Sequence, residues 1–353
     1  MSAPDVVDWD LALRVGRAVA GTGPKVTQAT RDQVRKDFED FVRVADQLVT
    51  EFTGLHPPDP AGKPVVLDRG GWIAVNIEGF RGLLRPLGDK FEGIRAGGKL
   101  GRMAMGLQLG LLLGYLSQKV LGQYDLLLAT GGAGKVYFVG PNVVAAERRW
   151  TFNARDFRLW IALHEVTHRT QFVAVPWLRD HVAGLVETYI STADIDAKRV
   201  REAIANIRSL IAQGPQAWKR ANLLTLFLTP AQLEVVTKMQ SLMTVVEGHG
   251  NFVMDRVGAE HIPTFDDMKG SLKAQREQSG LAERTLQKAM GLDMKYAQYS
   301  QGETFIAAVA DASGMEGLNL VWERAENLPT IPEIADPSAW LARVLRADAP
   351  AGG

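Results

Sequence analysis

The segment LWIALHEVTHRTQF, residues 159–172, constrains the fold of this chain more than any other stretch. It places His164 and His168 four positions apart in an otherwise apolar run, with Glu165 directly after the first histidine. Residues four apart on an α-helix lie about 40° from each other around its axis, so both imidazoles point the same way. The segment therefore predicts a helix that turns two histidines toward one point.

The flanking residues favour a helix over residues 154–173. Asn153 is a suitable N-cap, and the negative charge of Asp156 is favourable in the first turn of a helix. Pro176 is expected to end the helix. The residues that share the histidine face are predicted to point inward, and they are Phe157, Trp160, His168 and Gln171.

The H-E-x-x-H spacing predicts a metal site. The chain has no cysteine, so histidine and carboxylate must bind the metal, and zinc is the expected ion. Glu165 lies about 100° round the helix from His164, where it can reach a metal-bound water without becoming a ligand. Zinc lowers the pKa of that water, and Glu165 then acts as general base for attack on a carbonyl. The alternative is a pair of structural histidines in a core.

A third ligand is expected from residues 229–258. Thr229 caps a predicted helix over 230–257, with Pro230 at its first position and Gln232 completing a capping box. A carboxylate within an apolar stripe is costly unless a cation meets it, which makes Glu247 the predicted third ligand. The predicted core stripe comprises Leu233, Val236, Gln240, Met243, Glu247, Asn251 and Met254.

His249 and Asn251 are the other polar candidates on this helix. His249 lies about 200° from Glu247, so it binds the ion only if the helix breaks at Gly248 or Gly250. Otherwise it is a hydrogen-bond donor at the rim of the cleft or a surface histidine. Asn251, one turn after Glu247, either hydrogen-bonds a ligand histidine or is a buried amide that bonds a backbone carbonyl.

Hydrophobic periodicity predicts a mainly α fold with a small β-hairpin or sheet, of the α+β class. Residues 125–144 are the predicted strand region, with a glycine-rich turn between two β-prone runs. Residues 103–117 predict a buried helix whose Gly106, Gly110 and Gly114 form a ridge for close packing. The further predicted helices are 28–53, 72–85, 102–121, 178–192, 196–213, 271–290 and 299–313.

The composition excludes several classes of function. Lysine plus arginine equals aspartate plus glutamate, at 40 each, so no overall field attracts nucleic acid or anionic lipid. The N-terminus carries three aspartates before any apolar run, unlike a secretory signal. A cytoplasmic protein without nucleic-acid or membrane partners is the expectation, and the oligomeric state stays open.

Several segments together resemble a zincin-like metallopeptidase family of actinobacteria and their relatives, also labelled as hydrolases associated with deazaflavin-coenzyme biosynthesis. They are HEVTHRTQF, FRLW and VVEGHGNFVMD, with DWDLALRVG at 8–16, LGQYDLLL at 121–128, VYFVGPNV at 136–143, YAQYSQGETFIAAV at 296–309 and LPTIPEIADPSAWLARVL at 328–345. The resemblance implies a mostly helical fold with a zincin active-site helix pair. It also implies the gluzincin-type ligands His164, His168 and Glu247, with Glu165 as base, but it implies no substrate.

We expect one metallohydrolase domain over residues 1–345 and a disordered tail over 346–353. Its parts are an N-terminal helical part at about 1–122, a metal-site part at about 123–260 and a C-terminal helical part at about 261–345.

By analogy with zincins, the strand at 135–139, KVYFV, either pairs with an extended peptide or is an ordinary structural strand. The candidates for stabilising an oxyanion are Tyr296, Tyr299, Arg169 and His249.

Two classes of function follow from these predictions. The first is a zinc-dependent hydrolase, of the metallopeptidase kind, that cleaves amide bonds around one zinc ion. The second is a non-catalytic zinc protein, in which the ion clamps the helices at 154–173 and 230–257 together. A third, weaker hypothesis is a helical scaffold that binds a partner. Access of solvent to the metal site distinguishes the first two.

Overall fold

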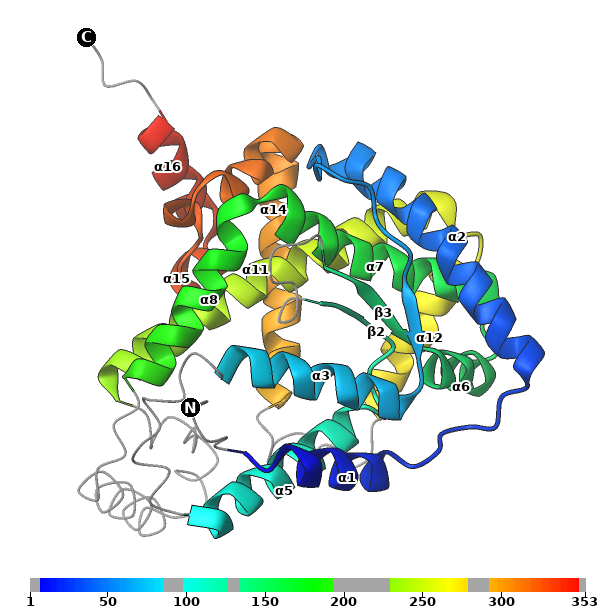
Figure 1. Ribbon diagram of the computed structural model, residues 1–353. Helices are drawn as coiled ribbons and strands as arrows, with labels where there is room; N and C mark the ends of the chain where they lie inside the picture. The colour runs from blue at the N-terminus through cyan, green and yellow to red at the C-terminus, as the bar shows by residue number, and fades with distance from the viewer. Residues whose placement is uncertain (1–6, 85–97, 126–133, 193–228, 279–291, 349–353) are drawn as a thin grey trace.

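The computed structural model describes residues 7–84, 98–125, 134–192, 229–278 and 292–348 (Figure 1). Helices dominate these segments and a three-stranded sheet accompanies them, so the predicted α+β class is confirmed. The helices are α1 (Trp9–Ala20), α2 (Gln28–Thr53), α3 (Arg69–Leu84), α5 (Gly98–Leu116), α6 (Gly140–Trp150), α7 (Ala154–Ala174), α8 (Pro176–Ser191), α11 (Pro230–His261), α12 (Phe265–Gln278), α14 (Leu292–Glu323), η3 (Ala325–Asn327), α15 (Ile331–Ala335) and α16 (Pro337–Asp348). The strands are β1 (Val65–Leu67), β2 (Gly122–Tyr124) and β3 (Val136–Val139).

Helices α7 and α11 begin where their caps predict. The side chain of Asn153 accepts hydrogen bonds from the N–H groups of Arg155 and Asp156. Thr229 and Gln232 form the reciprocal capping box at the start of α11. These side chains satisfy backbone donors that have no partner within the helix, and each cap stabilises by about 1 kcal/mol. Pro176 is the first residue of α8, so the helical direction changes at that proline as predicted.

The sheet has the order β1–β3–β2, with β1 parallel and β2 antiparallel to β3. Its central strand is anchored to α2 by Phe38 and Phe138, whose rings stack at 3.7 Å and 8°. Helix α7 contacts β2 and β3, whereas α3 contacts β1 and β3 (Figure 1). The sheet is therefore held between helices and places its edge strand β2 next to α7.

The strand region predicted at 125–144 is wrong at its C-terminal end. Residues 140–144 belong to α6, because Pro141 favours the first turn of a helix and outweighs the β propensity of two valines. The parallel strand β1 was not anticipated, because three residues carry too little periodicity to be recognised.

A smaller hydrophobic cluster joins α1, α3 and α5 beside the main core. The predicted glycine ridge of α5 lies against α1: a Cβ added to Gly110 would stand 2.6 Å from the carbonyl oxygen of Ala12. The opposite face is exposed, at 79% for Leu100 and 47% for Leu111, so α5 is buried on one side only. No helix in the described segments is long and apolar enough to cross a bilayer.

The remaining helix boundaries differ from prediction mainly in length. Helix α14 is longer than the predicted 299–313 and has a kink at Gly314, and α5 ends at Leu116 rather than residue 121. Helix α12 begins before the predicted 271–290. Helices α1, α6, α15 and α16 were not predicted, and α16 extends into the tail expected to be disordered. The predicted helix at 196–213 lies outside the described residues.

Candidate metal centre

Helices α7 and α11 contact each other (Figure 1) and bring His164, His168 and Glu247 together. The Nε2 atoms of the two histidines are 3.1 Å apart. An Oε2 atom of Glu247 lies 3.8 Å from Nε2 of His164 and 3.7 Å from Nε2 of His168. Two donor atoms from α7 and one from a residue about eighty positions later in the sequence thus surround one point.

This geometry fits a zinc ion. With metal–ligand bonds of about 2.0–2.2 Å in a tetrahedral site, neighbouring ligand atoms lie about 3.4 Å apart. The three distances, 3.1, 3.7 and 3.8 Å, lie around that value. Two imidazoles and a carboxylate are a ligand set that zinc accepts, and they leave a fourth position open.

Glycines allow the two helices to approach this closely. A Cβ added to Gly250 would stand 3.0 Å from Cε1 of His168 and 3.4 Å from Cε1 of His164. The backbone of α11 therefore lies directly against both imidazoles. Only glycine leaves that space without displacing a ring, and α11 runs through Gly250 without a break.

Both helices turn a half-buried line of residues toward the centre. Within residues 161–172 of α7, only His164 and His168 are not buried. Within residues 241–254 of α11, only Met243, Glu247 and Asn251 are not buried. The side chains of His164, Glu247 and His168 are 22%, 18% and 12% exposed, so each of the three is partly open to solvent.

The prediction that the Glu247 line forms the core face of α11 is therefore wrong. Val245, Val246 and Val253 are buried, whereas Leu233 is 44% exposed. Helix α11 is packed on nearly every side here, and the line that carries Glu247 is its least buried one. On α7 the predicted inward face is confirmed at Phe157 and Gln171, which are buried, whereas His164 and His168 between them are partly exposed.

Glu165 points from α7 toward β2. Its carboxylate accepts a hydrogen bond from the backbone N–H of Tyr124, and a Cβ on Gly122 would lie 2.7 Å from its Oε1 atom. Burial raises the pKa of Glu165 to about 7; the nearby imidazole of His168 and the Tyr124 N–H oppose this rise, and the charge of Glu247 adds to it.

Gln171 is the polar contact of the histidine pair that the sequence analysis left without a role. Its Oε1 lies 2.9 Å from Nδ1 of His168. Its Nε2 lies 2.9 Å from the carbonyl oxygen of Val246 and 2.9 Å from Nδ1 of His249. Its position three residues after His168 on the same helix face could have identified it.

The charges around His168 and His249 shift their pKa values in opposite directions. Burial lowers the pKa of His168, but the Glu247 carboxylate outweighs burial and raises it to about 9. Burial, followed by the charge of His168, lowers the pKa of His249 to about 3. His249 is fully buried against Trp322 of α14, so the expectation of a rim or surface histidine is wrong.

The other predicted candidates lie as follows. Asn251 is half-buried, and Gln171 is the amide that contacts His168. Arg169 is 1% exposed and is engaged by the carboxylate of Asp46 and the carbonyl oxygen of Asp59. Tyr296 and Tyr299 belong to α14, but their side chains lie outside the described part of the chain.

Of the two alternatives for residues 135–139, the structure favours the ordinary structural strand over the peptide-pairing edge. KVYFV includes β3, which lies between β1 and β2 and pairs with both. The edge strand beside Glu165 is β2. Because the N–H of Asp125 bonds the carbonyl of Lys135 and that of Val139 bonds the carbonyl of Leu121, the backbone groups of Gly122 and Tyr124 point away from β3.

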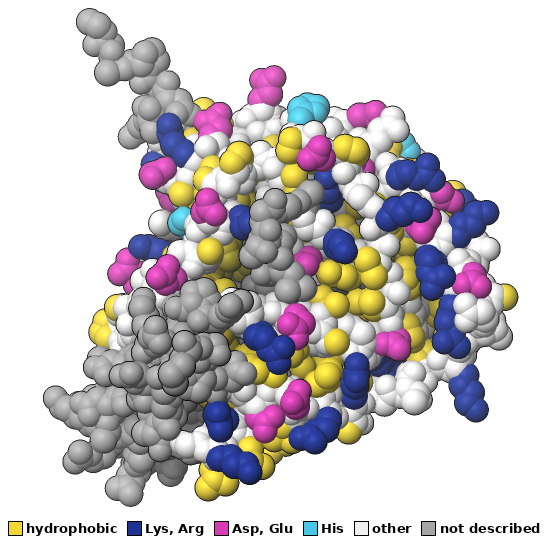
Figure 2. All heavy atoms as spheres, viewed as in Figure 1, with side chains coloured by type: hydrophobic (Ala, Val, Ile, Leu, Met, Phe, Trp, Pro, Cys, Tyr) yellow, Lys and Arg dark blue, Asp and Glu magenta, His cyan; other side chains and the backbone are white. Residues whose placement is uncertain are grey.

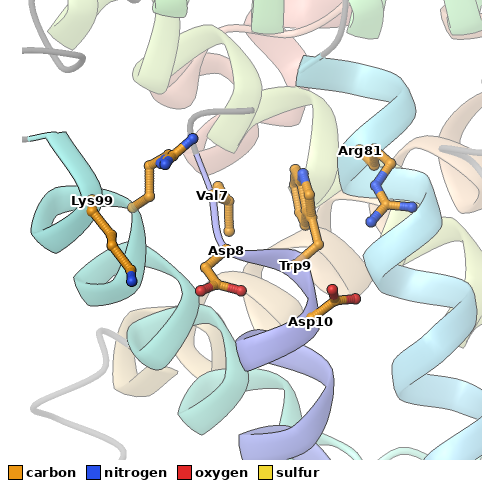
Figure 3. A pocket seen from close by; sticks show the side chains of 7 residues that line it. Val7, Asp8, Trp9, Asp10, Arg81 and Lys99 are labelled. Atoms are coloured by element: carbon orange, nitrogen blue, oxygen red, sulfur yellow. The ribbon is translucent and has the colours of Figure 1, made fainter. Parts of the chain in front are cut away.

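A separate pocket lies at the start of α1, and it contains none of these residues. Asp8, Trp9 and Asp10 line it with Arg81 of α3 and Lys99 of α5 (Figure 3). Acidic and basic side chains are also interspersed on the face shown in Figure 2, in keeping with the neutral net charge. Neither feature competes with the histidine pair as a site for chemistry.

Comparisons with known proteins give the family. A family model for zincin-like metallopeptidases matches residues 7–341. A crystal structure from Chloroflexus aurantiacus, provisionally described as a hydrolase with a novel fold, is 33% identical in sequence and has a TM-score of 0.70. The similarity covers 96% of this chain and 99% of that one. No protein of curated function matches the chain. Because the family model matches most of the length of this chain, the chain belongs to the zincin-like metallopeptidase family.

Proposed function

We propose that this protein is a zinc-dependent hydrolase that cleaves amide bonds, with peptides as its substrate class. His164, His168 and Glu247 hold one zinc ion, and Glu165 is the general base. The observation that carries the proposal is the meeting of Nε2, Nε2 and Oε2 within 3.8 Å of one another. The zincin-like family is the second support.

The bound ion supplies Lewis acidity, which lowers the pKa of a water and polarises a carbonyl. With the ion bound, the carboxylate of Glu165 would accept a proton from the attacking water and return it to the leaving amine. Tyr124 N–H donates to this carboxylate and Gly122 leaves room for it, so β2 fixes the orientation of the base. Glu165 lies on the β2 side of α7, near His168 and Glu247 but outside the cluster of three donor atoms, so it is free to act as the base.

Solvent access favours a catalytic over a structural metal. A structural zinc is closed by four protein ligands, whereas a catalytic zinc keeps an open position. Three donor side chains converge here, and each is partly exposed. A catalytic carboxylate also lies beside them with a backbone hydrogen bond and no Lys or Arg ion pair among the described residues.

The edge of β2 supports a peptide as substrate. Both backbone groups of Gly122 point away from β3, beside Glu165. An extended peptide pairing with this edge as an added strand would lay its backbone along the metal site. Main-chain pairing of this kind binds many sequences, so side-chain selectivity must come from elsewhere.

The test is Glu165→Gln, which keeps the size of the side chain and removes its basicity. We expect this variant to bind zinc at the wild-type stoichiometry by metal analysis and to lose turnover of a mixed peptide pool read by mass spectrometry. Glu260→Gln, at an exposed position of the same α11 that carries Glu247, is the matched control and should keep both. Wild-type turnover must also stop on chelation and return with zinc.

Two results would contradict the proposal in different ways. Full turnover by Glu165→Gln would show that another group is the base. Stoichiometric zinc in the wild type, together with no cleavage of any peptide or small amide in the pool, would instead indicate the non-catalytic zinc protein.

A further inference from the structure

Gln171 occupies an unusual position between the two helices of the metal centre. Its side chain is fully buried, and its amide contacts three groups at 2.9 Å: Nδ1 of His168, the carbonyl oxygen of Val246 and Nδ1 of His249. Two of these groups belong to the metal centre or lie next to it in sequence: His168 is a candidate ligand, and Val246 directly precedes the candidate ligand Glu247.

The carbonyl of Val246 decides which way the amide of Gln171 faces. A backbone carbonyl can only accept a hydrogen bond, so the Nε2 group must face it. The reversed amide would set two oxygen atoms against each other at 2.9 Å in a buried site, with no donor between them. The Oε1 atom of Gln171 must then face His168.

This orientation fixes the tautomer of His168. An amide oxygen only accepts, so Nδ1 of His168 carries the proton that Oε1 receives. In the neutral ring the lone pair is then on Nε2, the atom 3.1 Å from Nε2 of His164 and 3.7 Å from Glu247. That atom is the one that has to be unprotonated to bind a metal.

His249 completes the arrangement from the other side. The second N–H of the Gln171 amide points to Nδ1 of His249, which accepts it. The ring of His249 is fully buried and packs edge-on against Trp322 of α14 at 5.3 Å. Both N–H groups of Gln171 are thereby satisfied, and the amide has no freedom to turn.

We propose that Gln171 is a positioning residue of the metal centre, which holds His168 in the metal-binding tautomer and ties α7 to the turn of α11 that presents Glu247, and that His249 locks Gln171 in place. The inference rests on the proposed metal site. It also explains why a buried histidine stands two residues from Glu247 without facing the donor cluster.

The experiment compares Gln171→Met with a matched control. Methionine preserves the length of the side chain and removes every hydrogen bond. Gln232→Met is the control, because Gln232 is another buried glutamine whose amide links α11 to a neighbouring backbone, at Tyr189, away from the metal site. We expect Gln171→Met to weaken zinc binding about 10–100-fold in competition with a chelator, and Gln232→Met to lower thermal stability without changing zinc affinity.

A rescue pair separates a positioning role from simple packing. His249→Asn retains an acceptor near the place of Nδ1 and should keep zinc affinity within a few-fold of wild type. His249→Leu removes the acceptor and should weaken binding in the same direction as Gln171→Met. Circular dichroism and thermal unfolding establish that each variant is folded.

The tautomers are read directly by NMR on protein labelled with 15N-histidine, of which the chain has six. In zinc-loaded wild type we expect His168 to carry its proton on Nδ1 and to bind through Nε2, and His249 to carry its proton on Nε2. Wild-type affinity for zinc in Gln171→Met, or equal weakening in Gln232→Met, would overturn the inference while leaving the metal site intact. A wild-type protein that binds no zinc would overturn the proposed function itself.

Discussion

Gly248 of α11 and Gly302 of α14 meet backbone to backbone: a Cβ added to Gly248 would stand 2.3 Å from the carbonyl carbon of Gly302. From the α14 side, a Cβ added to Gly302 would come 2.2 Å from the carbonyl oxygen of Thr244, which is also on α11. This contact lies one residue from Glu247. The close contact between α11 and α14 thus helps to fix the position of α11 along its axis and its rotation about that axis, and with them the position of Glu247 relative to the histidines.

Gly248→Ala is expected to destabilise the protein and disturb the metal centre together. The new methyl group meets backbone rather than a movable side chain, so α11 and α14 must separate. This separation is expected to lower the free energy of unfolding by about 1–3 kcal/mol. Gly184→Ala on α8 is the control: its methyl meets nothing within 4 Å and should be neutral or stabilise by up to about 1 kcal/mol. Denaturant unfolding measures both, and equal stabilities would contradict the close crossing.

Gly122→Ala is expected to abolish turnover while zinc remains bound. The added Cβ would stand 2.6 Å from Cγ of Glu165, and that carboxylate must leave its place beside the Tyr124 N–H. The three donor side chains lie on other residues and keep their geometry. Metal analysis and the peptide-pool assay read the two properties separately. A variant with wild-type turnover would show that the orientation given by β2 is not needed.

Zinc is expected to raise the thermal stability of the wild-type protein. A ligand that binds only the folded state, at about 1,000 times its dissociation constant, stabilises by about 4 kcal/mol. Glu247→Ala should bind more weakly and show a smaller rise, because it retains only the two imidazoles. The rise should shrink as pH falls, because His164 and His168 must be unprotonated to bind the ion. Differential scanning fluorimetry with and without zinc tests this, and an equal rise in Glu247→Ala would place the ion elsewhere.

Arg158→Met is expected to be among the most destabilising changes in α7. The guanidinium of Arg158 bonds Glu147 at 2.7 and 2.8 Å and Asp37 at 2.6 Å, and all three side chains are buried. Removing the guanidinium leaves the two buried carboxylates without their buried cation, which is expected to cost about 3–5 kcal/mol of stability.

Arg155→Met provides the comparison for Arg158→Met. Arg155 lies on the same helix and approaches the same Asp37 at 3.9 Å, but its side chain is 71% exposed. Its loss should change the free energy of unfolding by no more than about 0.5 kcal/mol. Similar effects of the two substitutions on urea unfolding would show that the buried ion pairs carry little stability.

Much of the local structure could be predicted from the sequence. The caps at Asn153 and Thr229 placed the starts of α7 and α11, because capping depends only on side chains within three residues of the helix end. The ridge of glycines on α5 was also predictable, since residues four apart fall on one side of any helix. The family resemblance, carried by several short segments, was confirmed over residues 7–341.

Predictions failed where an outcome depended on a neighbour in space. Whether the strand at 135–139 was an edge stayed open, because its partner β1 lies about seventy residues earlier in the chain. The stripe containing Glu247 was predicted to be the core face, but α11 is buried on nearly every other side and this stripe is its least buried line. His249 looked like a surface residue because nothing local shows that Gln171 and Trp322 enclose it.

By itself, the sequence determined that His164 and His168 share one side of a helix and that Glu247 lies on another capped helix, because angular spacing around a helix axis follows from residue number alone. Only the tertiary structure decided that these two helices face each other, that Glu247 and not His249 stands by the imidazoles, and that Gln171 joins them. The physical reason is that packing sets the rotation of one helix relative to another. Here the α11 backbone approaches α14 closely at Gly248 and the two imidazoles of α7 closely at Gly250.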